Sequence, residues 1–267
     1  ARTLLIDDGF SGTLCATTGC MPSKLLIAAA RAHAGLDKAR LMGIDIPQAR
    51  VDGRRVMERL RNERDRFVAA TRESFAGLPD GTCIDARARF IAPDRLDLDD
   101  GRQVAARAVV IATGSRPVVP QPYRGLGPRV LTNDTVFEME DLPASMAVIG
   151  AGPLGAELAQ AFGLLGVQVA LFDEGDRLAK IRCDKVHDAF RPLYSHDVVL
   201  HLGVAPEPSA QDDGIRLAWG DQHQDFDCVL VATGRAPALE RLNLDAAGLR
   251  LDDKGTPVFD RRTLQCG

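Results

Sequence analysis

The 267-residue sequence predicts an α/β protein, and three observations lead to that class. The apolar run 146–149 leads into GAGPLG and a helical pattern, and a second apolar run follows at 167–172. Two further apolar runs, at 107–111 and 227–231, each end in ATG. Long stretches of the N-terminal part carry apolar residues at helical spacing. Short buried strands that alternate with helices are typical of α/β folds.

The first quarter of the chain predicts a strand followed by helices. TLLIDD, at 3–8, is a short apolar strand that ends in acids. A helix is expected from about 23–33, closed by Gly35, and a second helix over 52–76, where apolar positions recur at helical spacing. Residues 82–99 predict a strand, a turn and a strand.

The remaining elements follow the pattern of a nucleotide-binding fold. Residues 107–111 predict a buried strand, and the Pro- and Gly-rich segment 118–128 marks a crossing between domains. A strand–helix–strand unit is expected over 145–173. Further strands are expected near 198–204, 215–219 and 227–231, and at 256–260 within a loop-rich last segment.

CATTGCMPSK, residues 15–24, places Cys15 and Cys20 five residues apart at the start of the first helix. In a regular helix such residues have Cα atoms separated by roughly 8.6 Å, whereas a disulfide needs about 4.4–6.8 Å. A bonded pair therefore requires a break in the helix, which Gly19 and Pro22 favour. The helix N-terminus favours a thiolate. A disulfide between Cys15 and Cys20 would close a very short loop and would add little stability. The pair therefore suggests redox chemistry.

Composition argues against several classes of partner. The net charge is −4, and the basic stretch 54–66 is interleaved with acids, so a solvated helix face is favoured over nucleic-acid binding. The apolar stretch 146–172 contains Glu157 and several glycines, which favours a folded βαβ unit over a membrane span. No signal peptide opens the chain and its six cysteines are sparse, so a cytoplasmic protein is expected. The other cysteines are scattered and none has metal-ligand spacing with histidine, so no metal site is predicted; they are Cys83, Cys183, Cys228 and Cys266.

GAGPLG predicts a dinucleotide site because a strand precedes it and a helix follows. Gly150 allows the tight turn, Gly152 lets the backbone approach a pyrophosphate, and Gly155 lets the helix pack on the strand. The pyrophosphate is expected on the helix N-terminus. Asp173 ends the next strand, where an acid suits a ribose hydroxyl and repels a 2′-phosphate, so NAD is favoured over NADP. A glycine-rich turn without a ligand is the alternative.

CATTGCMPSK, the two ATG turns and GAGPLGAE occur in one order along nearly the whole chain. In this combination the sequence resembles the flavin-dependent class I pyridine nucleotide–disulfide oxidoreductases, and among them the dihydrolipoyl dehydrogenases. The resemblance implies a Rossmann-like two-domain fold with an NAD domain, 119–239, inserted into a partial FAD domain, 1–118, and a return segment, 240–267. It also implies FAD and NAD as cofactors, a dithiol or disulfide substrate such as lipoamide, and a homodimer in the longer protein.

The resemblance also assigns roles to residues. Cys15 and Cys20 become the redox disulfide, and Lys24 and Glu157 catalytic residues beside the flavin and the nicotinamide. For Glu157 the alternative is a charge that complements the helix dipole. The cofactor contacts that it implies are Asp7, Thr13, Cys15, Lys24, Ala88, Thr113, Gly114, Ser115, Gly150, Gly152, Pro153, Leu154, Gly155, Glu157, Asp173, Val204, Gly234 and Arg235.

The sequence departs from the family in several places. GTLC stands where the family has GGTC, and Asp7 stands where it usually has Glu. The chain begins at the second strand of the family's first unit and stops before its dimerisation domain, which carries an acid–base His–Glu pair. We therefore expect a middle piece of a longer enzyme, which binds NAD weakly, holds FAD poorly and does not oxidise dihydrolipoamide by itself.

The implied reaction passes two electrons between a dithiol, the cysteine pair, FAD and NAD. Cys15 would exchange with the substrate and Cys20 with the flavin. A second interpretation is a related NAD(P)H-dependent reductase of another disulfide or of mercuric ion. A third is a truncated NAD-binding module without activity.

Overall fold

The computed structural model describes residues 3–46 and 49–266, so the outermost residues of the predicted segments 1–118 and 240–267 lie outside it. The chain divides into two compact units. The first unit comprises Ala1–Thr13, Val68–Arg116 and Ala236–Gly267. The second unit comprises Leu14–Phe67 and Pro117–Arg235. The predicted domain boundaries stay a prediction.

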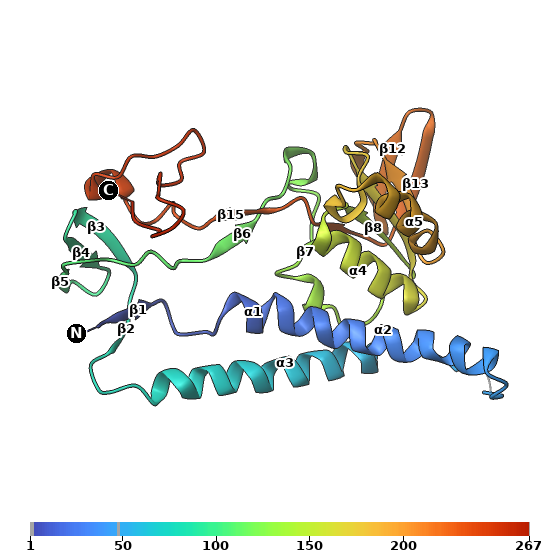
Figure 1. The fold of residues 1–267 in the computed structure, drawn as a ribbon, viewed down its shortest axis with the longest axis horizontal. Coiled ribbons are helices and arrows are strands. Elements are labelled where there is room, and N and C mark those ends of the chain that lie inside the picture. The colour runs from blue at the N-terminus through green and yellow to red at the C-terminus, as the bar shows by residue number, and fades with distance from the viewer. Residues whose placement is uncertain (1–2, 47–48, 267) are drawn as a thin grey trace. The chain divides into compact units, whose positions relative to one another are not determined.

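The second unit is built on a five-stranded parallel sheet with the strand order β10-β9-β8-β14-β7 (Figure 1). The strands are β7 Val130–Thr132, β8 Ser145–Ile149, β9 Gln168–Asp173, β10 Val199–Leu202 and β14 Cys228–Val231. The predicted strand–helix–strand unit forms as β8, the helix α4 (Pro153–Leu164) and β9, and the strands expected near 198–204 and 227–231 form as β10 and β14.

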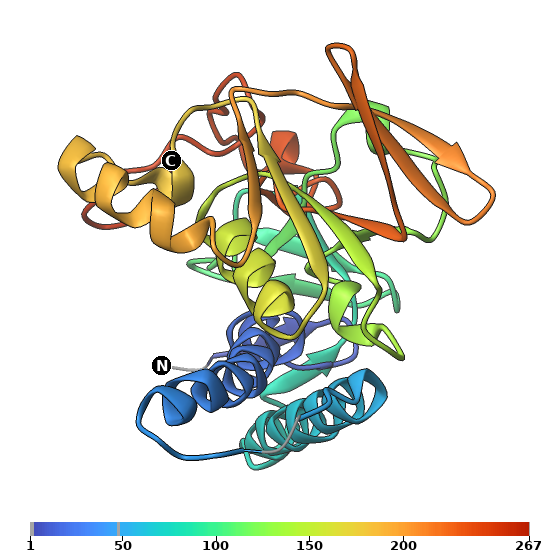
Figure 2. The same cartoon turned by 90° about the vertical axis from the view of Figure 1, so that its right-hand side faces the viewer.

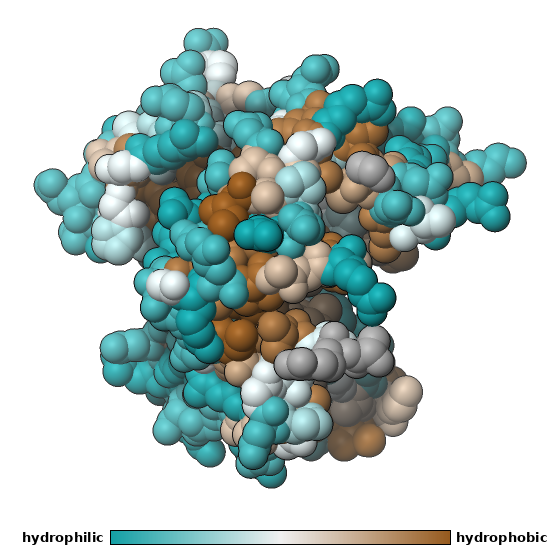
Figure 3. All heavy atoms as spheres, turned by 90° about the vertical axis from the view of Figure 1, so that its left-hand side faces the viewer, coloured by the Kyte–Doolittle hydropathy of each residue, from teal (hydrophilic) through white to brown (hydrophobic). Residues whose placement is uncertain are grey.

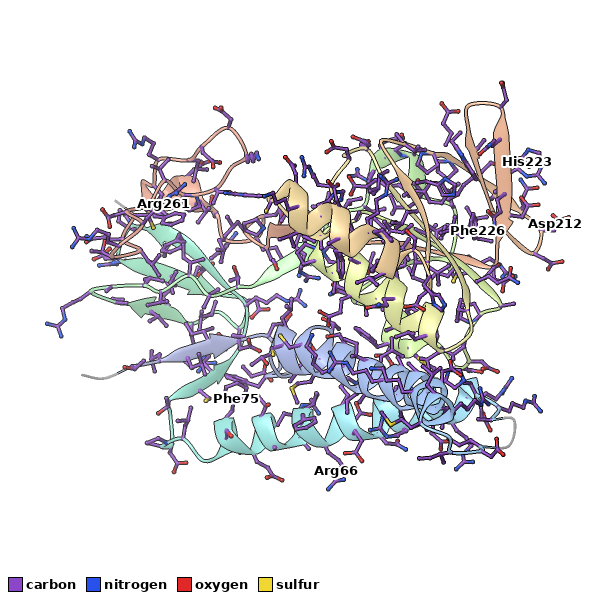
Figure 4. The ribbon with its side chains drawn as sticks, turned by 45° about the vertical axis from the view of Figure 1, so that its right-hand side comes forward. Arg66, Phe75, Asp212, His223, Phe226 and Arg261 are labelled. Atoms are coloured by element: carbon purple, nitrogen blue, oxygen red, sulfur yellow. The ribbon has the colours of Figure 1, made fainter. Side chains whose placement is uncertain are left out.

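The two faces of the parallel sheet pack against different elements, because successive side chains of a strand point to opposite faces. In β9, Leu171 packs in the core that includes α4, whereas Phe172 packs against an antiparallel three-stranded sheet. Figure 2 shows the helix α4 and the antiparallel three-stranded sheet around the parallel strands. Phe226 points into the layer between the sheets and His223 points away from it (Figure 4). The antiparallel strands are β11 Glu207–Gln211, β12 Gly214–Trp219 and β13 Gln222–Phe226.

Two long helices, α2 (Cys20–Leu41) and α3 (Gly53–Ala76), run side by side in opposite directions (Figure 1). The fully buried side chains of Leu26 and Leu60 join them to the core of the parallel sheet. The prediction that Gly35 closes the first helix is wrong, since α2 continues past it. A glycine inside a helix costs only about 1 kcal/mol, which the packing of α2 against α4 offsets.

The first unit contains short strands. The strand β1 (Leu5–Asp7) pairs in parallel with β2 (Cys83–Asp85). The strands β3 (Ala88–Ala92), β4 (Arg95–Leu98) and β5 (Gln103–Ala105) form an antiparallel sheet, which packs on the short helix η4 (Leu244–Ala247).

Figure 3 shows hydrophobic patches between hydrophilic side chains on one face of the molecule.

Smaller elements complete the chain. The strands β6 (Ser115–Pro117) and β15 (Arg235–Pro237) pair where the chain passes from one unit to the other and back. The remaining helices are α1 Leu14–Thr17, α5 Asp184–Tyr194, η1 Gln121–Tyr123, η2 Val136–Glu138 and η3 Leu178–Lys180. Within 3–46 and 49–266, no helix has the length and apolar character that crossing a bilayer requires.

Two predicted strands are wrong. Residues 107–111 are irregular, and Val110 is 87% exposed. A strand needs a hydrogen-bonded neighbour, and in the described part of the chain this segment is in no sheet. Residues 256–260 make only the single bridge between Leu251 and Pro257, and Pro257 has no N–H to donate.

Candidate active site

The two cysteines lie on either side of a break between two helices. Cys15 is in α1, and Cys20 is the first residue of α2. Gly19 between them has φ −115° and ψ −116°, and a Cβ there would lie 2.8 Å from the carbonyl oxygen of Leu14. The backbone is thus too close for a larger residue, and the interrupted helix that the spacing predicts is present.

Both thiols are exposed, and all six cysteines of the chain are free. The pKa of Cys15 is raised above the ordinary thiol value, first because its thiol is hydrogen-bonded to Cys20, and further because of slight desolvation and the Cys20 charge. A backbone hydrogen bond from Cys20 acts in the opposite direction and is outweighed. The expectation that the helix N-terminus favours a thiolate stays a prediction.

This contact predicts the pH dependence of Cys15. A raised pKa means less thiolate at neutral pH, so alkylation of Cys15 by iodoacetamide should keep accelerating beyond the pH at which an ordinary thiol levels off. In Cys20→Ala the hydrogen bond is lost, and the midpoint should move to lower pH. Mass spectrometry of the alkylated peptides measures both profiles. An unchanged midpoint in Cys20→Ala would contradict the contact.

Lys24 and Glu157 form an ion pair between α2, which begins with Cys20, and α4, which begins at the glycine loop. Lys24 is one helical turn after Cys20, and its side chain is 62% exposed, while that of Glu157 is 33% exposed. Exposed pairs add little stability, about 0–1 kcal/mol. The pair therefore holds a cation and a carboxylate near the thiols and is of little use as a brace. The sequence predicted each residue but not their pairing, which only the packing of α2 on α4 creates.

The glycine loop has the geometry that the sequence predicts. Gly150 has φ +109°, and a Cβ there would lie 2.6 Å from the carbonyl oxygen of Ala232. A Cβ at Gly155 would lie 1.9 Å from the carbonyl oxygen of Gly150. Gly152 caps α4 and is open, with only the Lys180 Cε within 4 Å, at 3.8 Å. A dinucleotide pyrophosphate fits here, because Gly152 leaves free the space in front of the helix N-terminus.

Asp173 braces the glycine loop from the end of β9. One carboxylate oxygen accepts a hydrogen bond from the Ala151 N–H at 2.5 Å, and the other accepts one from the Gly175 N–H at 2.7 Å. Each oxygen keeps a free lone pair, so the group remains able to accept from a ribose hydroxyl. Val204, also predicted as a contact, donates its N–H to the Asp173 carbonyl oxygen at 2.8 Å.

Lys180 is a residue of the site that the sequence did not indicate. The Ala179 N–H donates to the Ala151 carbonyl oxygen at 2.7 Å, which ties η3 to the glycine loop. Ala179 and Lys180 have φ +53° and +58°, a left-handed turn that directs the chain back toward the loop. The lysine brings a positive charge to the place where a phosphate would rest. No local motif marks it, since the contact depends on the turn after β9.

Three more residues meet at the ends of β7 and β14. These strands are neighbours, so the residues that follow them share one edge of the sheet. Arg235, predicted from ATGRAP, donates to Asn133 Oδ1 at 2.6 Å and to Asp134 Oδ1 at 2.9 Å. The preceding Gly234 has φ +126°. Asn133 and Asp134 were not predicted, because their role appears only when β7 and β14 are paired.

Two of the residues predicted to contact FAD in the first unit make hydrogen bonds within the protein. Asp7 accepts from the Phe10 N–H at 2.8 Å, and the Thr113 hydroxyl donates to the Ala238 carbonyl oxygen at 2.7 Å. Gly114 has φ +71°, and a Cβ there would have nothing within 4 Å. Thr13, Ala88 and Ser115 also belong to this unit. The roles of these residues toward a flavin stay predictions.

An exposed dithiol at a helix start and a dinucleotide-binding loop in the same unit are the two parts that define an oxidoreductase of thiols and nicotinamide nucleotides. A profile of the pyridine nucleotide-disulphide oxidoreductases matches residues 1–264, and the chain belongs to this family. The family depends on FAD and uses NAD(P)H.

Several curated proteins are similar to the chain over nearly its whole length. Dihydrolipoyl dehydrogenase of Chlamydia pneumoniae is 28% identical over 97% of this chain and 57% of its own length. Mercuric reductase of Staphylococcus aureus is 29% identical over 96% and 48%, and mycothione reductase of Mycobacterium tuberculosis is 29% identical over 97% and 58%. The chain thus spans about half to three-fifths of the length of these relatives.

A solved structure, the Cu(II) complex of the HOCl-induced flavoprotein disulfide reductase RclA from Escherichia coli, has the same fold. It superposes with a TM-score of 0.84 and 23% identity, over 99% of this chain and 58% of that one. The expected α/β, Rossmann-like class and the expected family are therefore confirmed.

Proposed function

We propose that the chain is the thiol- and nucleotide-binding part of a flavin-dependent enzyme that passes electrons between NAD(H) and the Cys15–Cys20 pair. One observation carries the proposal. The ion pair of Lys24 and Glu157 joins the helix that begins with Cys20 to the helix that begins at the glycine loop. The buried packing of α2 on α4, at whose surface this ion pair lies, keeps the thiol pair and the nucleotide loop within one unit.

The residues of the second unit have separate tasks in this proposal. Gly150, Gly152 and Gly155 hold the pyrophosphate, with Lys180 as a counter-charge and Asp173 as the acceptor of the ribose hydroxyl. FAD, when bound, relays the electron pair between nicotinamide and sulfur. Cys20 would face that relay, and Cys15, as its thiolate, would attack or release the substrate sulfur.

Lys24 and Glu157 act on the charge beside the thiols. The ammonium group of Lys24, one turn from Cys20, would favour negative charge on a flavin ring placed beside it. Glu157 accepts a hydrogen bond from Lys24 and so orients that group. The carboxylate would also lie beside a nicotinamide whose pyrophosphate rests at the start of the same helix.

Reduction by NADH tests the function directly. The chain is first oxidised at its thiols and then mixed without oxygen with NADH and an excess of FAD. Two new thiols, at Cys15 and Cys20, should become available for alkylation, and none should appear when FAD is left out. Thiols that appear at Cys83, Cys183, Cys228 or Cys266 instead would refute the assignment.

The preference for NAD over NADP follows from Asp173. A 2′-phosphate would bring negative charge beside its carboxylate, so NADH should bind more tightly than NADPH by about ten-fold or more. Asp173→Ala should reduce the ratio of NADH affinity to NADPH affinity. The variant loses both the acceptor for the ribose hydroxyl and the negative charge that repels a 2′-phosphate. Calorimetric titration of each nucleotide measures it, with Asp176→Ala as a control. Tighter binding of NADPH by the unchanged chain would overturn the preference.

For the substrate we propose dihydrolipoamide, with another disulfide or mercuric ion as the second candidate. The first rests on the sequence resemblance and on the similarity to dihydrolipoyl dehydrogenases; the second is favoured by relatives of equal identity that are mercuric or mycothione reductases. Dihydrolipoamide, mercuric ion and mixed low-molecular-weight disulfides, offered in turn to the FAD-loaded enzyme of which we propose the chain is a part, would separate them. A homodimer and a cytoplasmic location stay predictions.

A further inference from the structure

Asn133 lies at the end of β7, and its side chain reaches the turn between the two cysteines. The residue is only 5% exposed. Its amide nitrogen donates one hydrogen bond to the carbonyl oxygen of Thr18 at 3.1 Å and another to Asp134 Oδ1 at 3.0 Å. Its amide oxygen accepts from Arg235 at 2.6 Å. Both hydrogens and the oxygen of this buried amide are therefore used.

Thr18 is at the point of the chain that decides the distance between the thiols. It follows α1, which holds Cys15, and precedes Gly19, whose unusual dihedrals turn the chain into Cys20. Its own N–H donates to the Leu14 carbonyl oxygen at 3.1 Å, which closes the turn of α1. Its carbonyl oxygen points the other way and is held by Asn133. A shift of this peptide would move the helix break itself.

We propose that Asn133 is a positioning residue that sets the dithiol–disulfide equilibrium of Cys15 and Cys20. It ties the Thr18 carbonyl to Arg235, so the turn is fixed to the paired ends of β7 and β14. The fixed turn keeps the thiols in contact, which raises the effective concentration of one thiol for the other and favours the disulfide. The inference rests on the proposed redox role of the pair.

The reaction to be measured is exchange with oxidised glutathione. Each cysteine sulfur loses its hydrogen and one Sγ–Sγ bond forms. The glutathione S–S bond breaks and takes up the two electrons and two protons, giving two molecules of reduced glutathione. The equilibrium constant follows from the fraction of Cys15 and Cys20 protected from alkylation at fixed glutathione ratios. FAD and NAD are not needed for this readout.

Asn133→Asp is the sharpest variant, because it is isosteric and keeps an oxygen for Arg235. It replaces the N–H that faces Thr18 by a carboxylate oxygen, so an attractive contact becomes a repulsive one. The equilibrium constant should fall, by up to about five-fold, since a turn that is freed in the dithiol must be ordered again in the disulfide and the hydrogen bond that ordered it is worth about 1 kcal/mol. Asn133→Ser leaves the Arg235–Asp134 ion pair in place. It should also lower the equilibrium constant, and it replaces Asn133→Asp as the test if that variant does not fold.

Asn243→Asp is the matched control. Asn243 also donates its side-chain amide to a distant main-chain oxygen, that of Phe90 at 2.8 Å, but in the first unit. Its variant should leave the equilibrium constant unchanged. An unchanged constant in both Asn133 variants, or an equal fall in Asn243→Asp, would overturn the proposal. Failure of the unchanged chain to form a Cys15–Cys20 disulfide at any glutathione ratio would instead refute the proposed function.

Discussion

Gly152→Ala should leave the fold intact and weaken NADH binding by at least about ten-fold, which corresponds to about 1.4 kcal/mol. Gly152 has φ −65° and ψ 175°, which alanine adopts freely, and the added methyl group would have only the end of the Lys180 side chain within 4 Å. The same methyl group would occupy the space through which the backbone approaches a pyrophosphate. NADH titration by calorimetry, with a melting curve beside it, measures both properties.

Gly155→Ala gives the contrast that makes this result interpretable. Its methyl group would lie 1.9 Å from the Gly150 carbonyl oxygen, so the loop itself must shift. Overpacking of this kind costs about 1–3 kcal/mol, so the melting temperature should fall by roughly 2–12 °C. Gly35→Ala, inside α2 with open space around it, should be neutral or stabilising. Equal loss of stability in Gly152→Ala and Gly155→Ala would contradict separate roles for the two glycines.

Cys20→Ser should abolish the redox activity that we propose for the cysteine pair. A serine oxygen cannot form the S–S bond, so oxidation by glutathione should protect no pair of thiols, and NADH with FAD should release none. Cys15→Ser should have the same effect, because both sulfurs are required. Quantitative alkylation before and after oxidation measures the number of thiols lost.

Two other cysteines provide the controls for that experiment. Cys183 is exposed like the pair, whereas Cys228 is buried, and burial raises the pKa of its thiol to about 12. Cys183→Ser should leave the loss of two thiols intact, and Cys228 should stay unreactive at neutral pH. A disulfide that persists in Cys20→Ser would show that another cysteine is the partner of Cys15.

The glycine loop, the strand–helix–strand unit and the break between the cysteines could be predicted from the sequence. Each depends on neighbours within about thirty residues, and the residue types admit few alternatives. Gly150 needs a positive φ, and Gly155 a close approach. Gly19 stands where a Cβ would meet the Leu14 carbonyl oxygen. Local steric constraints of this kind can be predicted from the residue types and their order in the sequence.

The predictions failed where an element depends on a distant partner. Residues 107–111 have the apolar pattern of a strand, but a strand exists only when another segment offers it hydrogen bonds. Gly35 has the signature of a helix end, but α2 continues because its packing on α4 outweighs the cost of one glycine. Propensity is a weak signal that such tertiary contacts override.

The sequence by itself determined that this protein carries a dinucleotide loop and a thiol pair at a helix start. Only the tertiary structure decided how the parts of the second unit are connected. The pairing of Lys24 with Glu157 and the hydrogen bond from Asn133 to Thr18 join residues that are far apart in the chain. Such contacts follow from the order of the parallel strands and the packing of helices on them, and neither is encoded in any single local motif.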